Sequence, residues 1–194
     1  MERRESAFKE MSTFVLVHGA WHGAWCWERI IPLLEASGHR VIAPDLPGMG
    51  LDRTSLAEVS LDGWARFVAK IVEAESDRVV LVGHSRGGVV ISQAAEYVPD
   101  RIATLVYLTA FLVPNGKTLW STMQKAHRDP EQPPDFRRSA DQLTSVLLPD
   151  AVRRTFYNTT DEFWAARAAG LVGPEPVASF VTPLRLTETA FGGV

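Results

Sequence analysis

The clearest candidate for chemistry is a serine within the stretch LVGHSRGG, residues 81–88. Gly83, Ser85 and Gly87 form a G-x-S-x-G pattern directly after the apolar run Val79–Val82. In a sharp turn between a strand and a helix, such glycines avoid steric clashes and the serine is lifted clear of the sheet. Ser85 is therefore our candidate nucleophile. The alternative is a glycine-rich turn without chemistry.

A nucleophilic serine also needs hydrogen-bond donors for the oxyanion that forms when it attacks a carbonyl. The backbone N–H of Arg86 follows the serine at the expected N-terminus of a helix, where donors point at an anion. A second donor is expected from the loop after the first strand, and Ala20 in His18-Gly19-Ala20 is our candidate.

A general base for Ser85 is harder to find among the five histidines. His84 adjoins Ser85, but neighbouring side chains at such a turn point in different directions. His39 precedes a strand on the far side of a helix, and His127 lies in a later segment that leaves it freer to reach the serine. His18 and His22 belong to the loop that holds Ala20.

Alternating strands and helices predict an α/β fold with a parallel, doubly wound sheet and right-handed crossovers. The predicted strands are Thr13–Val17, Arg40–Ala43, Val79–Val82 and Ile102–Ala110. The predicted helices are Trp25–Ser37, which Gly38 ends, Ser60–Ala74 and Arg86–Tyr97.

The pattern changes after Phe111, where prolines are frequent and no convincing buried strand is found. Helices are expected over Thr118–His127, Pro149–Tyr157 and Thr160–Ala169, the last with a capping box of Thr159 and Glu162. This segment reads as a helical lid. Its large side chains could line a pocket or simply pack the lid onto the sheet: Trp120, Met123, Phe156, Phe163, Trp164 and Phe180.

Composition excludes several classes of function. A net charge of −3 and a pI near 6.0 give no indication of nucleic-acid or membrane-surface binding. No apolar run approaches the roughly 18 residues that span a bilayer. The single cysteine, Cys26, rules out an internal disulfide and favours a cytoplasmic location, with a packing role for this side chain. The scattered histidines predict no metal site, and GHSRGG lacks the lysine of a phosphate loop.

Two segments carry a resemblance to a known family: FVLVHGAWHGAWCWERIIPLLEASGHRVIAPDLPGMG (14–50) and VVLVGHSRGGVVISQAAEYVPDRIATLVYLTAFLVPNG (79–116). The chain resembles α/β-hydrolases, above all bacterial relatives of the plant methylesterase and hydroxynitrile lyase group. The resemblance implies a serine hydrolase of carboxylic esters that works through an acyl-enzyme on Ser85, with Ala20 and Arg86 N–H groups as the oxyanion hole and no cofactor. Hydroxynitrile lyase members carry a threonine where this chain has Gly19, which favours ester cleavage.

The same resemblance places the catalytic acid and histidine late in the chain, after the lid and after the last strand. This sequence ends at Val194, where a family member would enter its next core strand, so we expect the C-terminal strands, the acid and the histidine to be missing. Asn115 stands where some relatives carry an acid, but an amide cannot replace a carboxylate. Loss of a triad member removes a factor of about 10⁴ in rate, so weak or no turnover is expected.

The resulting domain prediction is a disordered leader at 1–11, a hydrolase core at 12–111, a helical lid at 112–190 and the start of a further core segment at 191–194. With later strands missing, Ile102–Ala110 would be an exposed sheet edge, which predicts a homodimer through that strand.

Two further hypotheses about function stay open beside the esterase, whose partner would be a small ester. One is a non-catalytic protein, which would either bind small molecules or have only a structural, oligomeric role without a ligand. The other is a hydroxynitrile lyase-like activity.

Overall fold

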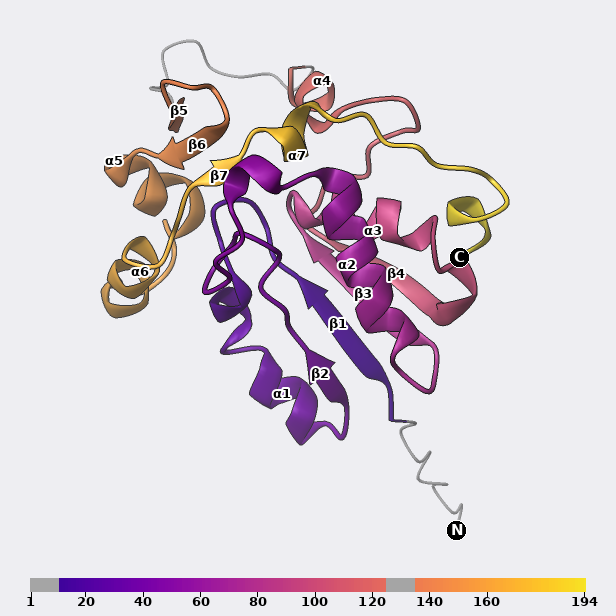
Figure 1. Cartoon of the computed structure of the whole chain (residues 1–194). Helices are drawn as coiled ribbons and strands as arrows, with labels where there is room; N and C mark the ends of the chain where they lie inside the picture. The colour runs from indigo at the N-terminus through magenta and orange to yellow at the C-terminus, as the bar shows by residue number, and fades with distance from the viewer. Residues whose placement is uncertain (1–10, 125–134) are drawn as a thin grey trace.

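The computed structural model describes residues 11–124 and 135–194, and its core is a four-stranded sheet. The strand order is β2-β1-β3-β4, and every neighbouring pair is parallel (Figure 1). The strands are β1 (Thr13–Val17), β2 (Arg40–Ile42), β3 (Val79–His84) and β4 (Ile102–Leu108). The predicted α/β class with a parallel sheet is confirmed. Of the predicted leader, only Met11 lies within the described residues.

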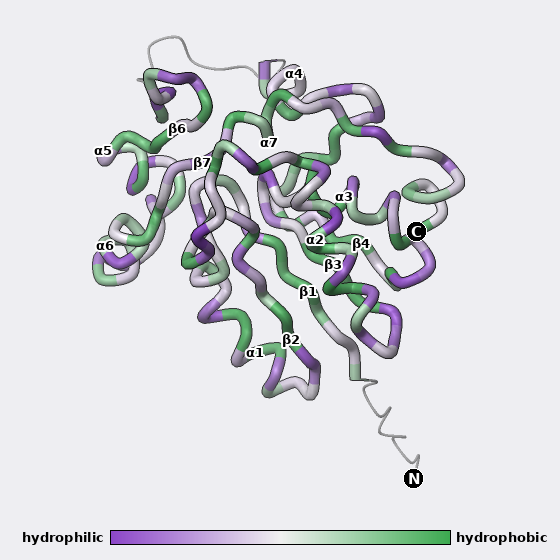
Figure 2. The backbone as a smooth tube through the Cα atoms, viewed as in Figure 1, coloured by the Kyte–Doolittle hydropathy of each residue, from purple (hydrophilic) through white to green (hydrophobic). Residues whose placement is uncertain are grey.

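Helices cover both faces of this sheet. Because side chains alternate across a strand, Val15 and Val17 of β1 face one side and Leu16 faces the other. Val15 and Val17 join the larger apolar cluster with α2 (Leu61–Glu73) and α3 (Gly87–Ala95). Leu16 joins a smaller cluster with residues of α1 (Ile31–Ala36). Apolar residues follow β1 and β3 through the centre of the molecule (Figure 2). The sheet is therefore doubly wound, as predicted.

One predicted core helix is divided. Instead of a helix over Trp25–Ser37, the chain forms a 3-10 turn at Ala24–Trp27 and then α1. Pro32 occupies the first turn of α1, where its missing N–H and fixed φ are tolerated, so the helix starts beside it rather than running through it. Gly38, with φ of 84°, ends α1 as predicted.

The segment after β4 forms a cap over the carboxyl ends of the core strands (Figure 1). Its helices are short: α4 (Leu119–Met123), α5 (Pro149–Ala151) with a π-helical turn at Val152–Phe156, α6 (Glu162–Ala169) and α7 (Ala178–Val181). A small sheet of order β5-β6-β7 lies among them, from Phe136–Arg138, Thr144–Leu147 and Glu175–Pro176. The end of the helix predicted over Thr118–His127 lies outside the described residues.

The prediction of a cap without strands is wrong. The three strands are two to four residues long, and β7 joins β6 across about thirty residues of intervening chain through the pairs Thr144↔Pro176 and Ser145↔Glu175. Strands this short show no alternating pattern in sequence. The capping box at Thr159 is also wrong, because Asp161 caps α6 by accepting from the Trp164 N–H.

Residues 191–193 form a 3-10 turn rather than a strand. The Phe191 N–H donates to a carboxylate oxygen of Glu96, which follows α3, so this turn packs beside the core. In the described ranges, no helix is long and apolar enough to cross a bilayer.

Strand β4 has an open edge. In the part of the chain that the structure describes, β4 pairs with β3 alone, and Thr104 and Leu108 are exposed. Unpaired N–H and C=O groups along such an edge invite pairing with another strand. We propose that two copies of the chain associate through β4.

This association predicts a dimer mass in static light scattering at high protein concentration. Thr104→Lys places a charge on the exposed strand and is expected to shift the mass toward the 21.4 kDa monomer. A monomeric mass for the unaltered chain across the concentration range would contradict the proposal.

Candidate active site

Ser85 lies on a strained turn between β3 and α3. Its φ is 52°, in the left-handed region that residues other than glycine rarely adopt. Of the four described non-glycine residues with positive φ, Trp21 and Thr109 also lie near this turn. Thr109 follows Leu108, whose carbonyl oxygen accepts from the Ser85 N–H at 3.4 Å. Strain concentrated in this way is typical of a functional site.

The glycines of the motif allow the close backbone contacts of this turn. A Cβ on Gly83 would lie 2.7 Å from the Gly87 carbonyl oxygen, and a Cβ on Gly87 would lie 2.7 Å from that of Val17. A Cβ on Gly19 would lie 3.1 Å from the Cβ of Ser85. The loop after β1 therefore lies directly against the serine, as the sequence predicted.

Two backbone N–H groups lie beside the serine, those of Ala20 and Arg86. Among the described residues, neither the Ala20 N–H nor the Arg86 N–H has a hydrogen-bond partner, although buried N–H groups are nearly always paired. These are the two donors named from the sequence. Their availability fits an oxyanion hole.

The side chain of Arg86 is buried in an ion pair with Glu175. The two side chains are 1% and 0% exposed, and Arg86 Nε lies 2.9 Å from Glu175 Oε1. That approach lacks hydrogen-bond geometry, whereas Arg86 Nη2 donates to the Gly19 carbonyl oxygen at 3.0 Å and to Glu175 Oε2 at 3.4 Å. Burial lowers the pKa of the guanidinium, and the Glu175 carboxylate opposes that shift. The guanidinium also stacks on Trp64, 4.4 Å from the ring centroid.

Glu175 joins the cap to the loop that holds Ala20. Its Oε2 accepts from the Trp21 N–H at 2.9 Å, and its Oε1 accepts from Ser179 Oγ at 2.8 Å. The Trp21 indole donates to the Ser145 carbonyl oxygen at 3.2 Å. The indole also packs against rings of the cap, those of Phe136, Phe156 and Phe180.

His18 and His22 shape this loop and are neutral. His18 Nδ1 donates to the Gly19 carbonyl oxygen and its Nε2 accepts from the Leu46 N–H, so both ring nitrogens are engaged. His22 Nδ1 donates to the Ala20 carbonyl oxygen and its Nε2 accepts from Tyr157 Oη, both at 2.7 Å. Burial lowers the pKa of His22 from 6.5 to about 4 and holds that of His18 well below its ordinary value.

No base is hydrogen-bonded to Ser85 in the described ranges, where its Oγ makes no hydrogen bond. His84 packs edge-on against Trp27, and burial lowers its pKa. His39 accepts from the Ser12 N–H at the opposite end of the sheet. His127 lies outside the described residues, and Asn115 Oδ1 accepts from the Leu186 N–H, a structural role.

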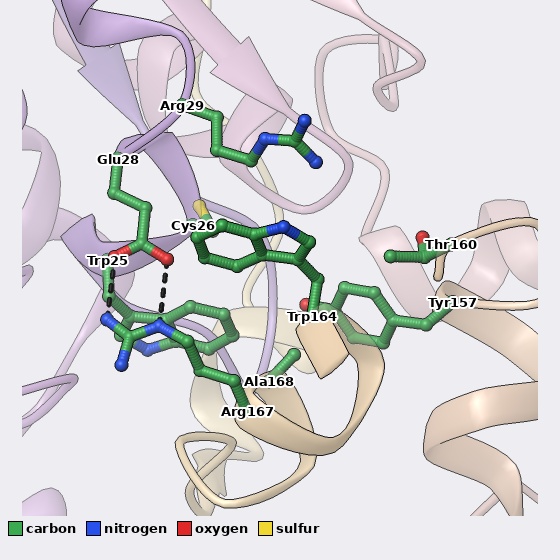
Figure 3. Close-up of a pocket in the computed structure, with 9 residues that line it drawn as sticks. All are labelled: Trp25, Cys26, Glu28, Arg29, Tyr157, Thr160, Trp164, Arg167 and Ala168. Carbon is green, nitrogen blue, oxygen red and sulfur yellow. Dashed lines mark hydrogen bonds and ion pairs between the residues drawn. The ribbon is translucent and has the colours of Figure 1, made fainter. Parts of the chain in front are cut away.

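A pocket near the serine opens between the core and the cap. A cavity of about 360 Å³ is lined by residues that flank the site, among them His22, His84, Leu108 and Tyr157. A neighbouring cavity of about 180 Å³ lies between the 3-10 turn and α6, and a bidentate ion pair of Glu28 with Arg167 closes one side (Figure 3).

Cys26 lines both cavities. Burial raises the pKa of its thiol to about 12, which supports the predicted packing role. Trp164 and Phe180 take the two predicted roles, since Trp164 lines the smaller cavity and Phe180 is buried on Trp21. Phe163 takes neither, because it is 71% exposed. In the described residues, no group of three or more His, Cys, Asp or Glu side chains could hold a metal ion.

The profile of the alpha/beta hydrolase family matches residues 14–191. The chain belongs to the alpha/beta hydrolase family. It is 44% identical over 119 residues to a carbendazim hydrolyzing esterase of Nocardioides sp. (strain SG-4G), a match that covers 60% of this chain and 49% of that one. It is 30% identical over 200 residues to methylesterase 7 of Arabidopsis thaliana, covering 93% and 74% of the two chains.

A solved structure supports the same family membership. A variant of tomato methylketone synthase I complexed with beta-ketoheptanoate superposes with a TM-score of 0.83 at 25% identity, over 95% of this chain and 76% of that one. The chain thus spans about half the length of the bacterial esterase and about three quarters of the plant proteins.

Sequence reasoning missed Glu175 and Tyr157, two cap residues whose side chains hydrogen-bond to the loop. Glu175 stands alone in Gly-Pro-Glu-Pro, and Tyr157 follows a π-helical turn. The only signal was Arg86, an arginine inside an otherwise apolar and glycine-rich turn, whose burial requires a nearby anion.

Removing the Glu175 carboxylate is expected to be costly. Glu175→Ala leaves the buried Arg86 charge unpaired, so the free energy of unfolding should fall by about 3–5 kcal/mol in urea titrations. Glu28→Ala breaks the Glu28–Arg167 pair, whose side chains are 34% and 44% exposed, and should cost less than about 1 kcal/mol. An equal fall in the free energy of unfolding for the two variants would contradict the larger penalty expected for leaving a buried charge unpaired.

Stability should also depend on pH through His22. In an unfolded chain a histidine has a pKa near 6.5, so between about pH 6.5 and 4 the unfolded chain binds a proton that the folded chain does not. Stability is therefore full above about pH 6.5 and declines by about 3 kcal/mol from this residue as the pH falls to about 4. His18 adds to the decline. Urea titrations across this range should show a shallower decline for His22→Gln, and an unchanged slope would refute the assignment.

Proposed function

We propose that this chain carries the nucleophile and the oxyanion hole of a carboxylic ester hydrolase. The observation that supports it is the strained Ser85 turn beside the N–H groups of Ala20 and Arg86, which have no hydrogen-bond partner among the described residues. The esterases among its relatives favour the same chemistry.

The proposed reaction begins when Ser85 Oγ attacks the ester carbonyl carbon and the carbonyl oxygen becomes an oxyanion. The Ala20 and Arg86 N–H groups stabilise that charge. The intermediate then expels the alkoxide, which leaves as the alcohol with the proton of the serine hydroxyl. Water hydrolyses the acyl-enzyme to the acid and restores Ser85.

The same geometry favours ester cleavage over hydroxynitrile lyase-like chemistry. A side chain at Gly19 would begin with a Cβ only 3.1 Å from both His84 Nδ1 and Ser85 Cβ. The threonine hydroxyl on which the lyase alternative depends has no equivalent here, so the loop offers backbone donors alone.

None of the described residues places a base in contact with Ser85. An unactivated hydroxyl is a poor nucleophile at neutral pH, and loss of the base alone costs a factor of about 10⁶. We propose slow turnover for this polypeptide by itself. A cavity of about 360 Å³ next to an unactivated serine also favours the second candidate, a protein that binds small molecules without converting them.

A serine-directed fluorophosphonate tests the proposal directly. Attack by Ser85 forms an Oγ–P bond and releases fluoride, with the serine proton as HF, and intact-mass spectrometry detects the adduct. One adduct that disappears in Ser85→Ala supports the hydrolase. A folded chain that gains no adduct after prolonged incubation overturns it in favour of the binding protein.

A further inference from the structure

The oxyanion loop is held on both sides of the Ala20 N–H, which has no partner in the described part of the chain. The Gly19 carbonyl oxygen accepts from His18 Nδ1 and from Arg86 Nη2, the latter at 3.0 Å. The Trp21 N–H donates to Glu175 Oε2 at 2.9 Å. The Ala20 N–H lies between these contacts. Its direction is therefore set by the Arg86–Glu175 pair.

Arg86 acts at two points of the same site. Its backbone N–H is one donor of the proposed oxyanion hole, and its guanidinium holds the loop that carries the other donor. The guanidinium cannot move freely, since it stacks on Trp64 and is 1% exposed. One side chain thus fixes the distance between the two donors.

Glu175 brings the cap into this arrangement. It belongs to β7, pairs in the small cap sheet with Ser145 and is held by Ser179 Oγ at 2.8 Å. The Trp21 indole donates to the carbonyl oxygen of the same Ser145. The cap sheet and the oxyanion loop are therefore joined by a main-chain contact and a side-chain contact at one residue, Trp21.

We propose that Glu175 and the Arg86 side chain are positioning residues for the oxyanion hole, so that seating of the cap and alignment of the two N–H donors are one event. The proposal rests on the proposed function, in which those donors hold the oxyanion. Neither side chain touches the reacting atoms. They act by holding the Gly19–Trp21 backbone, and a displacement of about 1 Å at such a site can cost about a hundredfold in rate.

The test compares two double variants that remove an arginine–carboxylate pair. Arg86→Met/Glu175→Gln leaves no buried charge and keeps an amide oxygen for the Trp21 N–H, so it is designed to fold. Arg66→Met/Asp62→Asn removes the exposed pair on α2, whose side chains are 61% and 57% exposed. Thermal melting first establishes that each variant is folded.

The first readout is the rate of Ser85 phosphonylation as a function of fluorophosphonate concentration. In Arg86→Met/Glu175→Gln the maximal rate should fall by about a hundredfold while the half-saturating concentration stays unchanged, because the pocket is intact and only the donors are displaced. The Arg66→Met/Asp62→Asn control should react like the unaltered chain. An unchanged maximal rate in the buried-pair variant overturns the proposal.

The second readout needs no reaction. Exchange of the Trp21 amide proton, followed by NMR, should be about tenfold faster in Arg86→Met/Glu175→Gln, because a neutral acceptor replaces a charge-assisted one. If the unaltered chain is not phosphonylated at all, the hydrolase proposal fails, and unchanged Trp21 exchange would then also overturn the positioning role.

A milder variant covers the case in which the double variant unfolds. Arg86→Lys keeps a charge opposite Glu175, but a single ammonium cannot reproduce the guanidinium fork that also reaches the Gly19 carbonyl oxygen. We expect a folded protein with phosphonylation slowed by about tenfold. A rate equal to that of the unaltered chain would count against the proposal.

Discussion

The buried pair of Arg86 and Glu175 holds this site together. Two charges with almost no exposure are tolerated only when each is paired and hydrogen-bonded, and here the additional partners are backbone groups of the loop beside the serine. The same contacts that offset the cost of burying the charges therefore fix the shape of that loop. Stability of the interior and geometry of the site are consequences of one arrangement.

This arrangement explains why strain persists at the serine turn. Ser85 at φ 52° and Trp21 at φ 62° are held from several directions: by the carboxyl end of β4, by the glycine contacts and by the Glu175 carboxylate. Strained residues survive only where the surroundings determine them fully. The described structure holds Ser85 and the N–H groups of Ala20 and Arg86 in this way, whereas it places no base against the serine.

Most of the core could be predicted from sequence, because its signals are local. Continuous apolar runs mark strands buried on both faces, Gly38 marks the end of α1, and the glycines around Ser85 mark a tight turn. The cap could not be predicted in the same way. Its strands are too short for a repeating pattern. Where several neighbouring residues could begin a helix, the sequence alone also does not decide between them, as at the N-cap residue Asp161 of α6 and at Pro32 in the core helix α1.

Residues close together in the chain were enough to predict the parallel sheet, the serine turn and the position of the loop after β1 beside Ser85. The folded chain was needed to find that Glu175 is the partner of Arg86, that His18 and His22 are neutral parts of the loop, and that the cap reaches Trp21. The difference arises because a buried charge selects its partner through space. Arg86 and Glu175 lie 89 positions apart, and no local sequence pattern between them indicates that they form a pair.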